Sequence, residues 1–104
     1  MSAKWKAYNP IWLVELAKDQ RPDLPWLAES LTHCTACWRK SRIMSYFVSP
    51  DRANQPAAEW QFKEVIELVH PEHGRLKLEV LKDGRIGGIE FYDRLFRHPG
   101  SSRR

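Results

Sequence analysis

The sequence predicts an α+β fold in which two N-terminal helices pack on one face of a four- to five-stranded antiparallel β-meander. Apolar residues recur at helical spacing up to residue 31, and runs with period-two alternation follow them. Two short turn sequences separate the last predicted strands, which is typical of a meander. With 104 residues and 42% hydrophobic content the chain can form one core, so we expect a single domain over residues 1–96.

The first predicted helix covers residues 10–19 and begins at Asn9-Pro10. Asn can cap the exposed amides of a helix start, and Pro is tolerated in the first turn. Pro22 ends this helix because it has no backbone N–H and disfavours helical geometry in the residue before it. A second helix is predicted over residues 23–31.

Four strands follow, rich in β-branched and aromatic residues, and they are predicted at residues 43–48, 62–70, 75–82 and 85–92. The turn at 70–74 has Pro and Gly where a hairpin loop needs them, and Asp83-Gly84 is a strong hairpin dipeptide. Residues 49–58 form the longest predicted loop, a frequent place for function. We expect one sheet face to pack on the helices and the other to stay mostly polar.

The last predicted strand has an irregular alternation. Ile86 is out of phase with Ile89 and Phe91, and Gly87-Gly88 lies between them. One extra residue brings all three apolar side chains to the same face, so a glycine bulge is predicted. The alternative is that the two glycines let a ligand or the backbone of a partner approach closely.

The charge of the chain is concentrated near its ends. The formal net charge is +4, but residues 7–96 hold twelve basic and thirteen acidic residues, which leaves this part near neutral. Residues 97–104 are expected to form a disordered basic tail. We therefore do not expect a nucleic-acid partner. No membrane-spanning stretch or signal segment is recognised, so no membrane association and a cytoplasmic location are expected.

Cys34-x-x-Cys37 and His70-x-x-His73 are the sharpest candidate for a metal site. Two thiolates and two imidazoles complete a tetrahedral zinc shell, and each spacing lets one turn present both ligands. Alternatively, the cysteines are small buried apolar residues and the histidines are ordinary turn residues. A redox role is disfavoured because a strand follows the cysteines where a thiol oxidoreductase has a helix. Zinc is thus kept as a hypothesis, and no other cofactor is expected.

The segment Val80–Phe91, with the sequence VLKDGRIGGIEF, resembles the end of a group of small, uncharacterised bacterial proteins. The resemblance covers the last 30 to 45 residues or so, as a matter of pattern. It implies a bacterial cytoplasmic protein with a terminal β-hairpin, and it carries over no catalytic residue. Bacterial proteins of this size and layout include antitoxins and toxin-immunity proteins, which is an analogy at the level of the fold.

No pattern typical of catalysis is found. The chain has no nucleophile elbow, no phosphate-binding glycine loop and no His-Glu-x-x-His sequence, so no catalytic residue is expected. It does have five Trp, and aromatic residues are enriched at protein interfaces. Trp12 and Trp26 are expected to be core or half-buried helix residues, whereas Trp5, Trp38 and Trp60 are candidates for an interface.

We therefore favour a non-catalytic bacterial module that binds another protein, of the immunity or antitoxin type. The expected partner-binding residues are Trp38, Trp60, Arg52, Asn54, Gln55 and Glu90. The alternative is a zinc-stabilised module that touches nucleic acid through Arg39, Lys40 and Arg42. The chain is expected to be a monomer, or a homodimer paired through an exposed edge strand.

Overall fold

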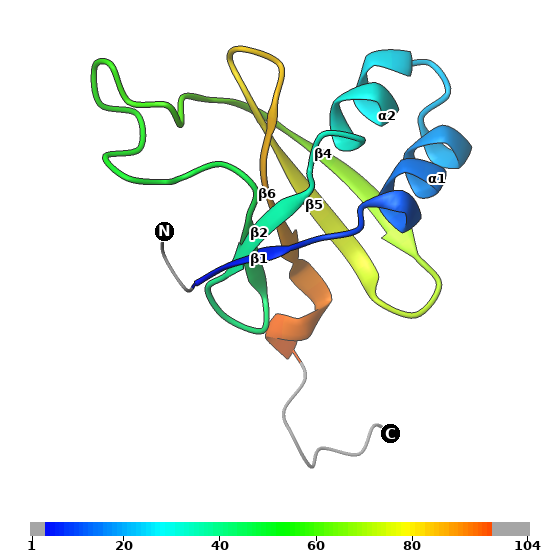
Figure 1. Ribbon diagram of the computed structural model, residues 1–104. Helices are drawn as coiled ribbons and strands as arrows, with labels where there is room; N and C mark the ends of the chain where they lie inside the picture. The colour runs from blue at the N-terminus through cyan, green and yellow to red at the C-terminus, as the bar shows by residue number, and fades with distance from the viewer. Residues whose placement is uncertain (1–3, 97–104) are drawn as a thin grey trace.

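The computed structural model describes residues 4–96 as a six-stranded antiparallel sheet with two helices on one face (Figure 1). The predicted α+β class is confirmed, with six strands in place of four or five. The tail predicted at residues 97–104 lies outside the described residues. Within the described residues, no helix has both the length and the apolar character that crossing a bilayer requires.

In chain order the elements are β1 (Trp5–Ala7), α1 (Ile11–Gln20), α2 (Pro25–Leu31), β2 (Ala36–Arg39), β3 (Met44–Tyr46), β4 (Phe62–His70), β5 (Gly74–Leu81), β6 (Ile86–Phe91) and the 3-10 helix η1 (Tyr92–Phe96). The helices and the three long strands lie within about two residues of the predicted ranges. β1 and β2 were not predicted, since strands of three or four residues are too short to show a clear alternation.

The strand order across the sheet is β1-β2-β3-β6-β5-β4. β4, β5 and β6 are consecutive hairpin strands, and β3 pairs with β6 rather than with β4. Residues 47–61 therefore carry the chain from the middle of the sheet to its far edge, as in a Greek key (green in Figure 1). This long connection supplies one wall of the pocket described below.

The main core lies between the helices and one sheet face. The helices contribute Leu13, Val14, Ala17, Leu27, Ala28 and Leu31, all buried. Ile66, Leu78 and Ile89 lie directly opposite one another on β4, β5 and β6 and face these helices. Burial of each large aliphatic side chain stabilises the fold by roughly 1.5–3 kcal/mol relative to exposure.

The two helical tryptophans differ in their environment. Trp12 is half-buried and packs against the core, as predicted. Trp26 is 38% exposed, so the expectation of a core or half-buried residue is wrong for it. α2 has only seven residues, and its inward side is taken by Leu27, Ala28 and Leu31, which leaves Trp26 on the outer side.

The glycine bulge predicted in β6 is confirmed. Val80 pairs with Ile86 and Glu79 pairs with Gly88, so Gly87 is the extra residue. Ile86, like the two apolar residues that follow the glycines, is buried in the main core. The extra residue thus corrects the phase of the strand, as the sequence pattern required.

The space over Gly87 is filled by the protein itself. A Cβ atom at this position would lie 2.7 Å from Leu81 Cδ2 and 2.7 Å from Trp60 Nε1. The Trp60 indole N–H also donates a hydrogen bond of 3.4 Å to the Gly87 carbonyl. The group that approaches Gly87 closely is therefore the indole of Trp60 and not an external ligand.

Near both ends of the edge strand β4, side-chain amides form hydrogen bonds with backbone groups that point away from the sheet. Near its end, the Val69 N–H donates a hydrogen bond of 2.8 Å to Gln20 Oε1, and the Val69 carbonyl accepts one from Gln20 Nε2. At its start, the Phe62 N–H donates to Asn54 Oδ1 at 2.9 Å. These side chains occupy groups that another strand would otherwise pair with.

Replacement of Gly87 by alanine is expected to destabilise the fold by about 1–3 kcal/mol, because the new methyl group would overlap the buried Leu81 and Trp60 side chains. Urea denaturation of the two proteins measures the difference. Gly84→Asn is the comparison without steric overlap: no atom lies within 4 Å of its Cβ position, so it should show only the strain of a side chain at φ +91°, which Asn tolerates better than most residues. Equal unfolding midpoints for wild type and Gly87→Ala would contradict the close packing over the bulge.

Candidate functional site

A row of aromatic side chains crosses the sheet face that points away from the helices, here called the open face. The strand register places one line of directly opposite residues on this face, in the order Trp5, Trp38, Tyr46, Gly88, Glu79 and Val65. The rings of Trp5 and Trp38 are 6.4 Å apart between centroids, and those of Trp38 and Tyr46 are 5.3 Å apart. All three are half-buried, and we call them the aromatic row.

The aromatic row corrects the expectation that this face is mostly polar. The polar residues expected there come from β4, β5 and β6, where charged side chains alternate with core residues. The aromatic part comes from β1, β2 and β3, of which β1 and β2 were not predicted as strands. Lys4 extends over this part, with its Nζ 4.0 Å from the centroid of the Trp38 ring.

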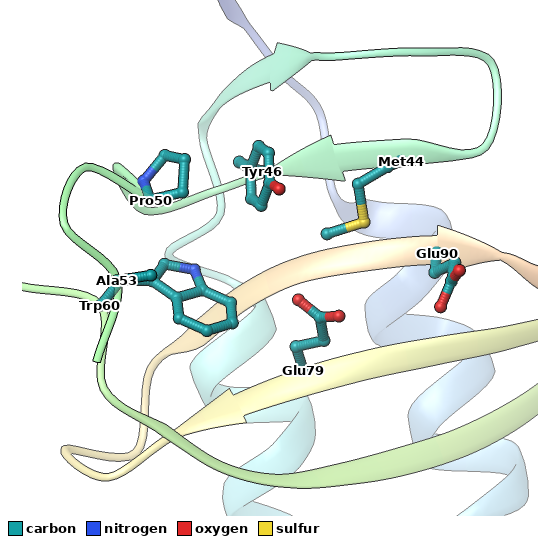
Figure 2. A pocket seen from close by; sticks show the side chains of 7 residues that line it. All are labelled: Met44, Tyr46, Pro50, Ala53, Trp60, Glu79 and Glu90. Atoms are coloured by element: carbon teal, nitrogen blue, oxygen red, sulfur yellow. The ribbon is translucent and has the colours of Figure 1, made fainter. Parts of the chain in front are cut away.

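A pocket of about 250 Å³ lies beside the aromatic row (Figure 2). Its sheet side is lined by Met44 and Tyr46 of β3, Glu79 of β5 and Glu90 of β6. Its other wall is lined by Pro50, Ala53 and Trp60, all from the 47–61 connection. A small apolar cluster of Val48, Trp60 and Leu81 fixes this connection to the sheet. The pocket is therefore built by the same long connection that closes the Greek key.

Two carboxylates, those of Glu79 and Glu90, line this pocket. Glu79 and Glu90 have no hydrogen bond or ion pair with any residue in the range 4–96. Burial raises the pKa of Glu79 above its ordinary value, and the nearby charge of Glu90 raises this pKa further. Lys77, which lies opposite Glu90 in the ladder, instead places its Nζ 4.1 Å from the centroid of the Tyr92 ring.

The structure places three of the predicted contact residues at this site. Trp38 is the middle member of the aromatic row, and Glu90 lines the pocket. Trp60 also lines the pocket, but it is only 7% exposed, and its ring packs with buried neighbours and stacks on Phe62. Trp60 therefore offers a partner little area of its own and acts mainly as a wall of the pocket.

The predicted loop residues are exposed, and two of them shape the backbone of the loop. Arg52 and Asn54 have positive φ angles of 55° and 67°. The Asn54 N–H donates to the Trp60 carbonyl at 2.8 Å, and its side chain accepts the hydrogen bond from Phe62 described above. Gln55 is exposed, and its N–H donates to the Arg52 carbonyl at 2.9 Å. Partner contact by these residues stays a prediction.

The structure does not bring the four predicted zinc ligands together. Among residues 4–96, no three His, Cys, Asp or Glu side chains are grouped so that they could hold a metal ion. Cys34 and Cys37 are free thiols, 5% and 9% exposed; Cys34 belongs to the main core, and Cys37 lies in β2. Burial raises the pKa of Cys34 to about 12, which disfavours the thiolate that zinc requires.

The two histidines lie at the turn between β4 and β5, where His70 is the last residue of β4 and His73 belongs to the turn. His70 Nδ1 accepts hydrogen bonds from the Glu72 and His73 N–H groups, which fixes the turn. The two imidazole rings are 4.6 Å apart and both contact the Trp12 ring. Desolvation lowers the pKa of His73, and the charge of the neighbouring His70 lowers it further. Within residues 4–96 these histidines are not grouped with the cysteines, and the turn-residue alternative accounts for their contacts.

Three residues of the site were not singled out from the sequence: Met44, Tyr46 and Glu79. Met44 and Tyr46 have the same parity in the predicted strand at 43–48, so their common face could be deduced. Their proximity to Glu79 could not, because it depends on the pairing of β3 with β6 across a long stretch of chain.

Glu79→Gln is expected to raise the thermal midpoint of unfolding at pH 7. The folded-state pKa of Glu79 lies above its ordinary value of 4.5, so the fold favours the protonated form. Its contribution to stability is therefore present at low pH and is lost as pH rises through the raised pKa. The advantage of the variant should shrink towards pH 4 in a calorimetric pH series. Glu15→Gln, at an exposed position of α1, is the control that should show no such trend.

Both thiols are expected to resist alkylation in the folded protein. The high pKa of Cys34 and the burial of both side chains keep the thiolate scarce and inaccessible at pH 8. Mass spectrometry after brief treatment with iodoacetamide should show an unmodified chain, and two added groups should appear in denaturant. Rapid labelling of Cys34 without denaturant would contradict its position in the core.

Comparison of this chain with protein-family models, with curated proteins and with solved structures finds no match. Its function is therefore inferred from the geometry of the aromatic row and the adjacent pocket.

Proposed function

We propose that this chain is a non-catalytic module that binds another protein through its open face, as an immunity or antitoxin-like inhibitor does. The observation that carries the proposal is the aromatic row of Trp5, Trp38 and Tyr46 on the surface of a regular sheet. Large aromatic side chains in such a position are typical of interface anchors. The exposed loop residues Arg52 and Gln55 belong to the same connection whose residues Pro50, Ala53 and Trp60 line the pocket.

The row suits a partner because the sheet holds its members in place. Each aromatic residue belongs to a strand with a fixed register, and each ring contacts its neighbour in the row. Little conformational entropy is then lost when a partner covers them. Each ring is also partly accessible, so a partner would remove additional apolar surface from water.

The charge of the open face favours a polypeptide over a nucleic acid. Glu67, Glu79 and Glu90 lie on this face, on three neighbouring strands, and would repel a phosphate backbone that crosses it. Of the exposed basic residues at 39–42, Arg39 is the last residue of β2, and Lys40 and Arg42 lie in the turn that leads to β3. A nucleic-acid strand placed on the aromatic row would have to pass the carboxylates.

The two cysteines support a cytoplasmic location within the same proposal. Cys34 and Cys37 are buried free thiols, the form that cysteine keeps in a reducing compartment.

Trp38→Ala and Tyr46→Ala are expected to weaken partner binding about 30-fold each, as truncation of an interface anchor costs about 2 kcal/mol. The test is affinity capture by the full chain from its source cells, followed by native mass spectrometry and titration of the captured protein. Trp26→Ala is a matched control, because Trp26 is 38% exposed on α2 and lies away from the open face.

Unchanged affinity in both open-face variants would show that the contact surface lies elsewhere. A captured nucleic acid in place of a protein, lost in the same variants, would show that the class of partner is wrong.

A further inference from the structure

We propose that the pocket on the open face receives the guanidinium group of an arginine side chain presented by the protein partner. This inference rests on the proposed function, and it specifies the chemistry of the partner at one point of the contact surface.

The pocket has the size and shape of a site for one long side chain. Its volume is about 250 Å³. Tyr46 and Trp60 both line it, and the Glu79 carboxylate points into the space that the labelled side chains surround (Figure 2). An extended aliphatic stem can therefore pass between apolar walls while its polar end reaches the carboxylates.

The charge of the pocket selects a cation. Glu79 and Glu90 are placed on adjacent strands, and neither has a partner within residues 4–96. Ionised carboxylates only accept hydrogen bonds, so a ligand that satisfies both must donate several. A positive ligand also removes the repulsion between the two carboxylates, which no neutral ligand does.

A guanidinium group fits this arrangement better than an ammonium group. It carries five N–H donors in a planar fork, which can serve two carboxylates at once. Its flat face also stacks on an aromatic ring, as the walls formed by Tyr46 and Trp60 allow. An ammonium group is a compact point charge that is more strongly hydrated.

Two basic residues of β5 on the same sheet face, Arg75 and Lys77, have their contacts outside the pocket. Arg75 forms an ion pair of 2.7 Å with Asp93, and its guanidinium lies 4.5 Å from the Tyr92 ring centroid. Lys77 also points to Tyr92. These two cations of β5 therefore lie against η1, and within residues 4–96 neither Glu79 nor Glu90 has an ion pair. This is the charge pattern expected where a partner supplies the cation.

The first experiment titrates the isotope-labelled full chain with a short capped peptide that contains one arginine, followed by NMR. Its matched probe is the same peptide with citrulline, which keeps the shape and loses the charge. Saturable shifts of the Trp60 indole and Gly88 amide signals are expected with arginine, with at least about tenfold weaker binding of citrulline. A peptide with lysine should also bind less tightly than the arginine peptide.

The second experiment repeats the arginine titration on carboxylate variants. Glu79→Gln and Glu90→Gln should each weaken binding about tenfold, because each removes one charged acceptor. Glu67→Gln is the matched control: it removes an exposed carboxylate from the same face, on β4, outside the pocket lining. Its affinity should equal that of wild type.

Equal binding of arginine and citrulline, equal binding of arginine and lysine, or equal losses in Glu67→Gln and Glu79→Gln would each overturn the arginine pocket. These outcomes are separate from the partner-capture test. If the captured partner binds through Trp38 but the pocket does not bind arginine, the protein-binding function is supported and only the arginine pocket is contradicted.

Discussion

The extra residue in β6 is the constraint on which the rest of the structure depends. Without Gly87 in the bulge, Ile86 and Ile89 could not both face the helices. The Gly87 carbonyl accepts hydrogen bonds from the backbone N–H groups of Phe47, at 2.8 Å, and Val48, at 3.2 Å. It also accepts the hydrogen bond from the Trp60 indole N–H. One backbone position thus sets the phase of the core strand and anchors both ends of the long connection that walls the pocket.

Packing on the two sides of the sheet is connected through this position. The helix side needs buried aliphatic residues in phase, and the open side needs Trp60 close to the backbone, which only glycine permits. Next to it, Gly88 leaves room for the Met44 side chain, whose Cε lies 2.8 Å from the place of a Cβ. The two adjacent glycines therefore serve the site through contacts with the chain itself.

The sequence was sufficient for the features that local patterns encode. Helical spacing after Asn9-Pro10, turn residues such as Asp83-Gly84, and the parity of Ile86 against Ile89 each specify local geometry. β1 and β2 were missed because three or four residues do not establish a period. Their absence from the predicted sheet concealed the aromatic row, since that row exists only where the strands pair.

The site itself depends on contacts between distant parts of the chain. A tryptophan beside a long loop looks the same in sequence whether it is exposed or, like Trp60, folded back on a glycine. The spacing of Cys34 and Cys37 likewise suits both a zinc site and two buried apolar positions, and only the fold separates these alternatives. Glu79 becomes part of a pocket only because the pairing of β3 with β6 brings Met44 and Tyr46 near it.

The edge of β4 offers few free backbone groups to a strand of another molecule. Gln20 and Asn54 hold the outward backbone groups near the two ends of a nine-residue strand, so an incoming strand would find only a short interior stretch to pair with. Exposed valines at positions 65 and 69 would otherwise make this edge a template for sheet-to-sheet growth. Two amide side chains thus leave this edge of the sheet with few free backbone groups for another strand.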